Sequence, residues 1–328
     1  MTITRRTVLA STALAAAPLG GPALAQTATS NPAPTQGSGT RQAPGFYRYR
    51  VGDIEVTAIN DGSAPRALEG FIRNAELSAV QQAAREAFMP QDTIQNSFTT
   101  LVLNQGGRVT LIDTGNGDSG APTTGRWLDN FRAAGFDPSQ VNTVVISHFH
   151  GDHINGLRRK DGTAVFPNAE ILVPAAEWAF WMDDARMNQA PEAARGGFQG
   201  ARRVFGPIAK DVKHYEMDKE IVPGLTSIAA PGHTPGHTAY MLSSGSGRLL
   251  ILSDTANHPA LFVRNPDWSA VFDMDADQAR ATRYKMLDLA ASERAQVAFY
   301  HAPFPATGHI AKDGSGFRFV PVQWSPAV

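Results

Sequence analysis

The sequence of 328 residues contains no cysteine. A chain without thiols cannot form disulfides, use a cysteine nucleophile or hold zinc through thiolates, which leaves histidine and carboxylate chemistry. Its charges nearly cancel, with 29 Lys and Arg against 30 Asp and Glu and a formal net charge of -1. This balance gives no electrostatic signature of nucleic acid or of an anionic membrane as a partner.

The sequence also lacks the G-x-S-x-G pattern that presents a serine nucleophile on a tight turn. Its nearest approach is Gly117-Asp118-Ser119-Gly120, which is followed by Ala121 where the pattern needs glycine. We therefore set a serine-hydrolase mechanism aside. The hydrophobic content of 42% is enough for a large core.

The first 25 residues are typical of a cleaved export signal. Arg5 and Arg6 precede a segment rich in Ala and Leu, and Ala23-Leu24-Ala25 resembles a cleavage site of the twin-arginine type. The apolar part is too short to span a bilayer, so we expect no stable membrane insertion and a periplasmic or secreted protein. An ordinary secretory signal or an uncleaved anchor is the alternative. Residues 26–42, rich in Thr, Ser, Pro, Gly and Gln, predict a flexible linker before a single domain over 43–328.

Four potential metal ligands lie within the six-residue run HFHGDH, residues 148–153, directly after an apolar, strand-like segment. Side chains alternate in an extended chain, so His148 and His150 point the same way and can hold one ion. Asp152 and His153 follow the bend and are directed at a neighbouring position. This arrangement suits two metal ions about 3.5 to 4 Å apart.

Three more potential ligands follow apolar segments later in the chain. His233 lies in the loop GHTPGH, Asp254 ends the run LLILSD, and His301 ends the run VAFYH. Side chains at strand ends have a rigid sheet behind them, as a pre-organised site requires.

The order H-x-H-x-D-H, G-H-T-P-G-H, S-D and a late His resembles the metallo-β-lactamase-fold hydrolases, over about Ala43 to Pro326. Within that superfamily the chain is similar to methyl parathion hydrolase and its lactonase and arylesterase-like relatives, in the segments Ala43–Arg48, Leu111–Gly115, Phe166–Ala169, Phe304–Ile310 and Gly316–Val322. The resemblance implies an α/β fold, a four-layer αββα sandwich.

The apolar patterns are consistent with this architecture, because strands alternate with helices that can cover two packed sheets. Strands are expected over 54–59, 98–103, 108–112, 143–146, 171–173, 225–229, 239–242, 249–252 and 297–301. Helices are expected over 77–88, 127–134 and 277–292, with helical pieces up to Trp181. Asn60-Asp61-Gly62 predicts a turn that closes the first of these strands.

The resemblance also assigns roles to the ligands: His148, His150 and His233 for the first metal, Asp152, His153 and His301 for the second, and Asp254 as a bridge. Nitrogen and oxygen ligands without sulfur suit two Zn²⁺ per chain and tolerate Mn²⁺, Co²⁺ or Fe²⁺. Two divalent ions lower the pKa of a shared water from about 15.7 to about 7, so a metal-bridging hydroxide is the expected nucleophile. Asp254 and Asp152 are the expected catalytic carboxylates.

Three further residues have candidate roles near the metals. The family pattern gives Asp113 the role of orienting a ligating histidine, although it could merely open a turn. His258, four residues after Asp254, could line the pocket or pack in the core. His309 is interpreted as a pocket residue or as a residue behind the ligands.

Trp181 and Phe198 are candidates for an aromatic substrate pocket, with core packing as the alternative. Such a pocket would favour a small-molecule lactone or carboxylic (aryl) ester, as in quorum-quenching lactonases. Phosphotriester hydrolysis is the main alternative, which the polar segment Asn116–Gly120 makes less favourable. Ile154 argues against a β-lactamase, and a bridging Asp254 argues against a non-catalytic metal-binding protein. Family analogy suggests a homodimer.

Overall fold

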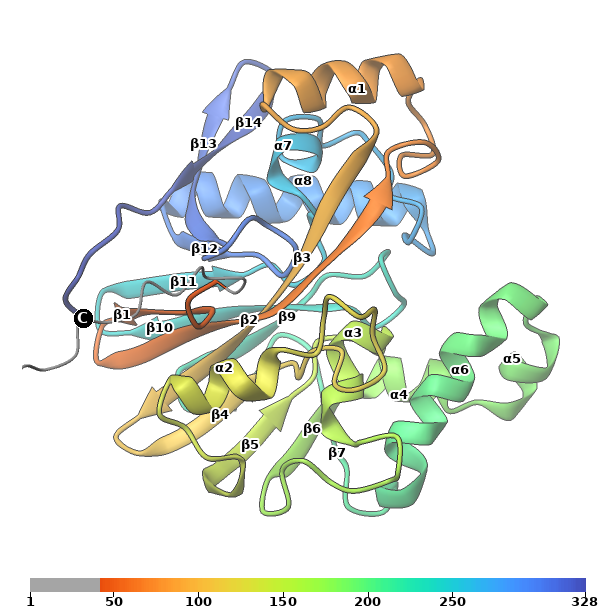
Figure 1. The fold of residues 1–328 in the computed structure, drawn as a ribbon, viewed down its shortest axis with the longest axis vertical. Helices are drawn as coiled ribbons and strands as arrows, with labels where there is room; N and C mark the ends of the chain where they lie inside the picture. The colour runs from red at the N-terminus through yellow and green to blue at the C-terminus, as the bar shows by residue number, and fades with distance from the viewer. Residues whose placement is uncertain (1–41) are drawn as a thin grey trace, which may run out of the picture. The chain divides into compact units, whose positions relative to one another are not determined.

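The computed structural model describes residues 42–328 as two seven-stranded sheets (Figure 1). The predicted signal, 1–25, and all but the last residue of the predicted linker, 26–42, lie outside the described residues. The sheets have mirrored strand orders, β1-β2-β3-β4-β5-β6-β7 and β14-β13-β12-β11-β10-β9-β8. Each sheet is therefore built by one half of the chain.

The first sheet is antiparallel from β1 to β4 and parallel from β4 to β7. Because parallel strands end at the same edge of a sheet, the segments that follow β4 and β5 meet there. The strands are β1 (Phe46–Val51), β2 (Ile54–Ala67), β3 (Thr93–Gln105), β4 (Arg108–Ile112), β5 (Val141–Val145), β6 (Glu170–Pro174) and β7 (Lys213–Tyr215).

The second sheet has one parallel pair, β11 with β12, so the segments after these two strands also meet. Its strands are β8 (Glu220–Val222), β9 (Leu225–Ala229), β10 (Thr238–Ser244), β11 (Gly247–Ile251), β12 (Gln296–Ala298), β13 (Thr307–Asp313) and β14 (Gly316–Pro321).

The apolar runs of the central strands are continuous because both faces of each sheet are covered. In β3, Leu101 and Leu103 face the second sheet, whereas Val102 faces the helices outside the first. In β11, Leu249 faces the first sheet and Leu250 faces the opposite helical layer. The core thus has three apolar layers, which is the packing of an αββα sandwich. The predicted four-layer fold is confirmed.

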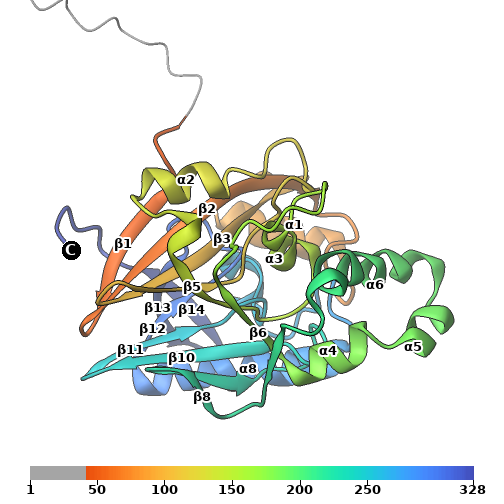
Figure 2. The same ribbon diagram turned by 90° about the horizontal axis from the view of Figure 1, so that it is seen from below.

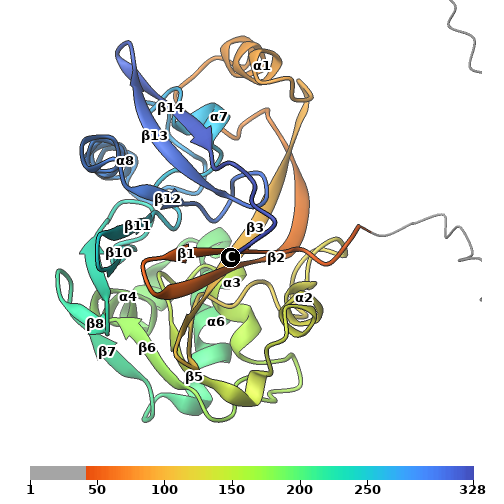
Figure 3. The same cartoon turned by 90° about the vertical axis from the view of Figure 1, so that its left-hand side faces the viewer.

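Helices cover the outer face of each sheet, and α1, α7 and α8 lie beside β12 to β14 in Figures 1 and 3. These helices are α1 (Leu77–Glu86), α7 (Pro259–Phe262) and α8 (Ala276–Glu293). Those that cover the first sheet are α2 (Trp127–Ala133), α4 (Ala175–Trp181) and α6 (Glu192–Phe205). Shorter helical segments are α3 (Gly151–Ile154), α5 (Asp184–Gln189), η1 (Pro138–Gln140), η2 (Asn155–Leu157) and η3 (Gly206–Ile208).

Between residues 42 and 328 no helix is long and apolar enough to cross a membrane.

The turn predicted at Asn60-Asp61-Gly62 is wrong. β2 continues to Ala67, with a register shift between Asn60 and Gly62, and its outer part pairs with the start of β3. Gly62 has a φ of 110°, and a β-carbon there would lie 2.2 Å from the Thr123 carbonyl oxygen. The glycine therefore marks a bulge inside a long strand, because only glycine permits this conformation and this close approach.

Helix α6 was not expected from the sequence, because the expected helical pieces end at Trp181 and α6 begins at Glu192. Figure 2 shows α6 beside α5 at one end of the molecule. Its three glycines, Gly196, Gly197 and Gly200, lower helix propensity and hide the pattern. Buried side chains along one face, including Phe198 and Phe205, hold the helix against the first sheet. Tertiary packing therefore overrides the local preference.

Candidate metal centre

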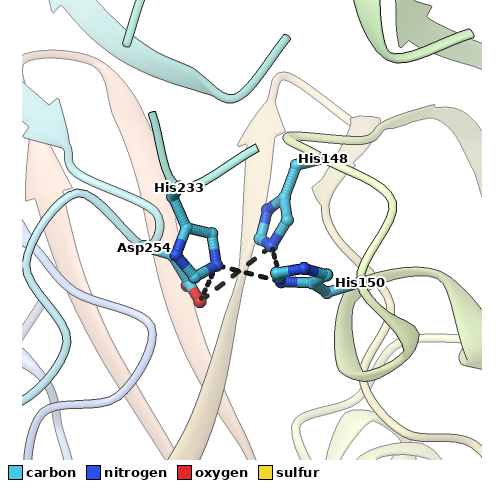
Figure 4. Close-up of side chains that lie close together, drawn as sticks. All are labelled: His148, His150, His233 and Asp254. Carbon is cyan, nitrogen blue, oxygen red and sulfur yellow. Dashed lines mark hydrogen bonds and ion pairs between the residues drawn. The ribbon is translucent and has the colours of Figure 1, made fainter. Parts of the chain in front are cut away.

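The structure brings all seven predicted ligands together in two groups. In each group the candidate ligand atoms lie within 4.8 Å of one another: His148, His150, His233 and Asp254 in the first group, and Asp152, His153 and His301 in the second. Figure 4 shows the first group, with the four side chains pointing toward one another: His148 and His150 come from one loop, and His233 and Asp254 from two others.

Every one of these residues follows the end of a strand. His148 and His150 come directly after β5. Helix α3 then turns the chain, so that Asp152 and His153 join His301 in the second group. On the second sheet His233 lies between β9 and β10. Asp254 follows β11 and His301 follows β12, the two parallel neighbours.

Asp254 faces both groups. Its Oδ2 lies 3.3 Å from His233 Nε2 and 3.0 Å from His301 Nε2, whereas its Oδ1 lies 3.3 Å from His153 Nε2. Among residues 42–328, neither His153 Nε2 nor Asp254 Oδ1 has a hydrogen-bond partner although both atoms are buried. Buried polar atoms normally have a partner, so this set of inward-facing nitrogen and oxygen atoms fits divalent cations. Imidazole nitrogens and carboxylate oxygens are ligand atoms that such cations prefer, and here most of them are buried in two adjacent groups.

Burial lowers the pKa of His148 well below its ordinary value and that of His150 to about 3, so both imidazoles are neutral and have a lone pair to offer. For His153, burial opposes protonation, but the carboxylates of Asp254, Asp152 and Asp113 outweigh it and raise the pKa well above the usual range. Burial likewise opposes protonation of His233, and its hydrogen bonds to carboxylates raise the pKa to about 9. The carboxylates therefore attract positive charge into the centre, which a proton or a metal ion can supply.

Asp113 lies where its predicted orienting role requires. Its Oδ2 accepts a hydrogen bond from His153 Nδ1 at 2.8 Å, while Ser147 donates from its backbone N and its Oγ at 2.7 Å. Its φ of 62° is in the left-handed region, an uncommon conformation that turns the chain at the end of β4. Asp113 thus fixes which nitrogen of His153 faces the metal groups.

The GHTPGH loop is braced by its second histidine. His237 Nδ1 donates to the Ala230 carbonyl oxygen at 2.8 Å, and His237 Nε2 accepts from the Asp254 backbone N at 3.0 Å. His237 therefore supports the His233 loop and Asp254 rather than joining either metal group.

Two buried carboxylates of the site were not found from the sequence. Glu177 in α4 accepts hydrogen bonds from the backbone N of Phe149, the backbone N of Gly236 and Trp181 Nε1, at 2.7 to 2.9 Å. Asp273 accepts from His233 Nδ1 at 2.9 Å. The only sequence signal for Glu177 is a single charge in the apolar run AAEWAFW, and Asp273 is hidden among other aspartates in FDMDADQ.

Four residues predicted for the pocket or its surroundings lie elsewhere than over the metal groups. Trp181 is buried behind His150, with ring centroids 6.2 Å apart, and Phe198 packs on Trp181 at 4.9 Å. Their core alternative therefore describes them better. His258 accepts the capping hydrogen bond of α7 and lines a separate cavity, and His309 is an exposed residue of β13. The structure supports no contact of His309 with the centre.

A cavity of about 300 Å³ opens over the two groups. Its walls come partly from the long β2 and β3 strands, through Arg66, Asn96 and Phe98, and partly from Phe272 and Asn116. Sequence patterns did not predict Arg66, Asn96 or Phe98 as wall residues, because the outer part of β2, which pairs with the start of β3, was not expected to be a strand. Asn116 belongs to the polar segment Asn116–Gly120 that was expected to affect substrate choice. The cavity gives a small molecule access to Asp152, Asp254, His150, His233 and His301.

Comparison with known proteins identifies the family. The Metallo-beta-lactamase superfamily model matches residues 93–301, a segment that contains all seven candidate ligands. The chain belongs to this superfamily. Its members include metal-dependent hydrolases, so the expected enzyme class is confirmed.

Curated relatives include N-acyl homoserine lactonase of Bacillus sp, 26% identical over 60% of this chain and 66% of that protein. N-acyl homoserine lactonase AttM of Agrobacterium fabrum is 24% identical over 61% of this chain and 75% of that protein. The expected kinship with lactonases is confirmed.

Two solved structures share the fold closely. AidC, a dizinc quorum-quenching lactonase in complex with the product N-hexanoyl-L-homoserine, has a TM-score of 0.81 and 27% identity, covering 86% of this chain and 98% of AidC. The hydrolase AbOPH of the beta lactamase superfamily has a TM-score of 0.82 and 27% identity, covering 87% of this chain and 100% of AbOPH.

Proposed function

We propose that the protein is a dinuclear metal-dependent lactonase, which opens the ring ester of N-acyl homoserine lactones. The observation that carries this proposal is Asp254, whose Oδ2 faces His233 of the first group and His301 of the second, while its Oδ1 faces His153 of the second. The carboxylate lies beside an open cavity. The lactonase relatives support the substrate class, and the dizinc AidC supports two Zn²⁺ as the ions.

When bound, two divalent ions would make a water nucleophilic near neutral pH and polarise the ester carbonyl. His148, His150 and His233 would hold one ion, Asp152, His153 and His301 the other, and Asp254 would contact both.

Asp152 has a further part in this proposal, because its side chain is 22% exposed whereas those of His153 and Asp254 are buried. Burial alone would raise the pKa of Asp152, but His153 and His301 overcome this and lower it to about 2. The carboxylate is therefore ionised at neutral pH. Its Oδ2 lies 3.5 Å from His153 Nε2 and 3.6 Å from His301 Nε2, and would hold the ion. The other carboxylate oxygen can accept the proton that the attacking water loses and pass it to the leaving alkoxide.

The cavity walls suit an acyl-substituted ring. Phe98 and Phe272 offer apolar surface to an acyl chain, while Asn96 and Asn116 bring amide groups to the same cavity. The aromatic pair also favours aryl esters as a second candidate class, and phosphotriesters are tested beside them.

The test is a hydrolysis panel on zinc-loaded protein with acyl homoserine lactones, aryl lactones, aryl esters, methyl parathion and a cephalosporin. We expect the highest kcat/KM on acyl homoserine lactones. Hydrolysis of the cephalosporin or methyl parathion without hydrolysis of any lactone would contradict the proposal.

Replacing the shared carboxylate provides the decisive variant. We expect Asp254→Asn to lower the metal content toward one ion per chain and to abolish lactone hydrolysis, because an amide cannot supply two anionic oxygens. Asp161→Asn, in an exposed turn, is the matched control and should keep both ions and full activity. Full activity of metal-depleted Asp254→Asn would refute a metal-dependent mechanism.

We further propose that residues 1–25 direct twin-arginine export, and that the enzyme acts in the periplasm or outside the cell, as a homodimer by family analogy. The paired Arg5 and Arg6 support the export route. Fractionation of cells and sizing of the mature enzyme test these points.

A further inference from the structure

Arg283 of α8 is a buried guanidinium next to the metal centre, with only 1% of the residue exposed. Its Nε donates to the carbonyl oxygen of Thr255 at 2.9 Å, and its Nη1 donates to the carbonyl oxygens of Pro266 and Trp268. Its Nη2 lies 3.2 Å from Asp273 Oδ2. The side chain therefore connects α8 to the residue after Asp254 and to the loop that carries Asp273.

Asp273 joins this guanidinium to a candidate metal ligand. While Oδ2 faces Arg283, Oδ1 accepts from His233 Nδ1 at 2.9 Å. The Met274 backbone N also donates to the carbonyl oxygen of His233 at 3.2 Å. The loop that carries Asp273 and Met274 therefore holds both the backbone and the side chain of His233. With Nδ1 used in this way, His233 must present Nε2 to the centre.

The second metal group has an orienting carboxylate of its own. Asp113 accepts from His153 Nδ1, and its other contacts come from Ser147 rather than from a cation. Thus one imidazole in each group is oriented by a carboxylate. Asp113 follows β4 in the first half of the chain, and Asp273 lies in the loop between α7 and α8 in the second half.

Packing alone does not account for the Arg283 and Asp273 pair. Burying two charges has a desolvation cost that apolar side chains of similar size avoid. Both charged groups contact residues at the centre. Asp273 bonds to His233 directly, and Arg283 bonds to the carbonyl oxygen of Thr255, the residue after Asp254.

We propose that Arg283 and Asp273 are positioning residues for the metal position formed by His148, His150 and His233, and that they set its affinity separately from the position of Asp152, His153 and His301. Asp113 has the equivalent role for the second position. The inference rests on the two-ion centre of the proposed function, and it needs no particular substrate.

The experiment compares Asp273→Asn and Arg283→Lys with Asp113→Asn in the full chain. Metal-free protein is titrated with zinc in competition with a chromophoric chelator, and bound metal is counted by elemental analysis. We expect Asp273→Asn to lower the zinc affinity of one of the two positions by about 10- to 100-fold and to leave the affinity of the other unchanged. Arg283→Lys should lower the affinity of the same position. Excess zinc should restore two ions per chain.

Cobalt spectra then identify the weakened position. At limiting Co²⁺, the absorption spectrum of Asp273→Asn should match that of His233→Ala, and the spectrum of Asp113→Asn should match that of His153→Ala. This readout distinguishes a positioning role from general loosening of the fold, which would alter both positions alike.

Two results would overturn the proposal: wild-type affinity at both positions in folded Asp273→Asn, or equal weakening of both positions in Asp273→Asn and in Asp113→Asn. Circular dichroism of the metal-free proteins verifies folding, and the isosteric Asp273→Asn keeps the test available if Arg283→Lys does not fold. A wild-type protein that binds only one ion would refute the two-ion centre and this inference together. Two ions with no lactone hydrolysis would refute only the proposed substrate.

Discussion

At the scale of single residues, buried polar side chains carry most of what distinguishes this site from ordinary core. Glu177 has no exposed surface, and burial raises its pKa even though several hydrogen bonds act in the opposite direction. Its carboxylate joins Phe149, which stands between two candidate ligands, to Gly236 in the His233 loop. One acidic group therefore connects loops from the two sheets.

We predict that Glu177→Gln destabilises the protein and weakens metal binding. A glutamine must turn its NH₂ group toward either the Gly236 N–H or the N–H groups of Phe149 and Trp181, which leaves buried donors unsatisfied. The free energy of unfolding of the metal-free protein should fall by about 1–3 kcal/mol in urea titrations. Glu192→Gln, on the exposed start of α6, is the control. Equal stability and zinc affinity in both variants would show that Glu177 does not join the loops.

At the scale of elements, α6 shows a conflict between local preference and tertiary contact. Its glycines cost helix stability, yet a β-carbon on Gly197 would lie 2.8 Å from Cζ3 of Trp181, the ring behind His150. At Gly200 a β-carbon would meet nothing within 4 Å. One glycine is required by packing and the other is not.

These two positions give a matched pair of variants. Gly200→Ala should raise the free energy of unfolding by about 0.5–1 kcal/mol, because alanine loses less backbone entropy in a helix. Gly197→Ala should lose this gain and raise KM, because the Trp181 ring must shift against His150. Chemical denaturation and steady-state kinetics measure both effects. An equal gain in stability from both substitutions, with unchanged KM, would contradict the packing argument.

At the scale of the whole molecule, the centre lies between two half-chains. The first half supplies the HFHGDH residues, and the second supplies His233, Asp254 and His301. Ions bound to ligands from both halves would stabilise the folded state by mass action, since the unfolded chain offers no assembled site.

Removal of metal should therefore lower Tm. At free zinc 100-fold above Kd, each ion contributes about 2.7 kcal/mol, so differential scanning calorimetry should show a decrease of several degrees on chelation and its recovery with zinc. Asp254→Asn should show a smaller difference between the metal-free and zinc-loaded forms. An unchanged Tm on full metal removal would mean that the two halves are joined by packing alone.

The sequence predicted the seven candidate ligands from their places after apolar runs, and it predicted the sandwich from its resemblance to the metallo-β-lactamase-fold hydrolases, with which the apolar patterns agree. Strands such as β3 and β11 are apolar on both faces, which signals burial between layers, and the ligands stand directly after such strands. The outer part of β2 was missed because a bulge at Gly62 and a turn have similar residue preferences. Helix α6 was missed because its stability comes from contacts distant in sequence.

The sequence by itself determined the chemistry available to this protein: without cysteine, its clustered histidines and aspartates leave nitrogen and oxygen coordination as the means of binding metal. Only the tertiary structure decided which groups meet. Asp273 meets both His233 and Arg283, and Glu177 lies between the two motif loops, through contacts across 10 to 59 positions of the chain. Such pairs leave no periodic trace in a sequence, because a single buried charge is recognisable only once its partners surround it.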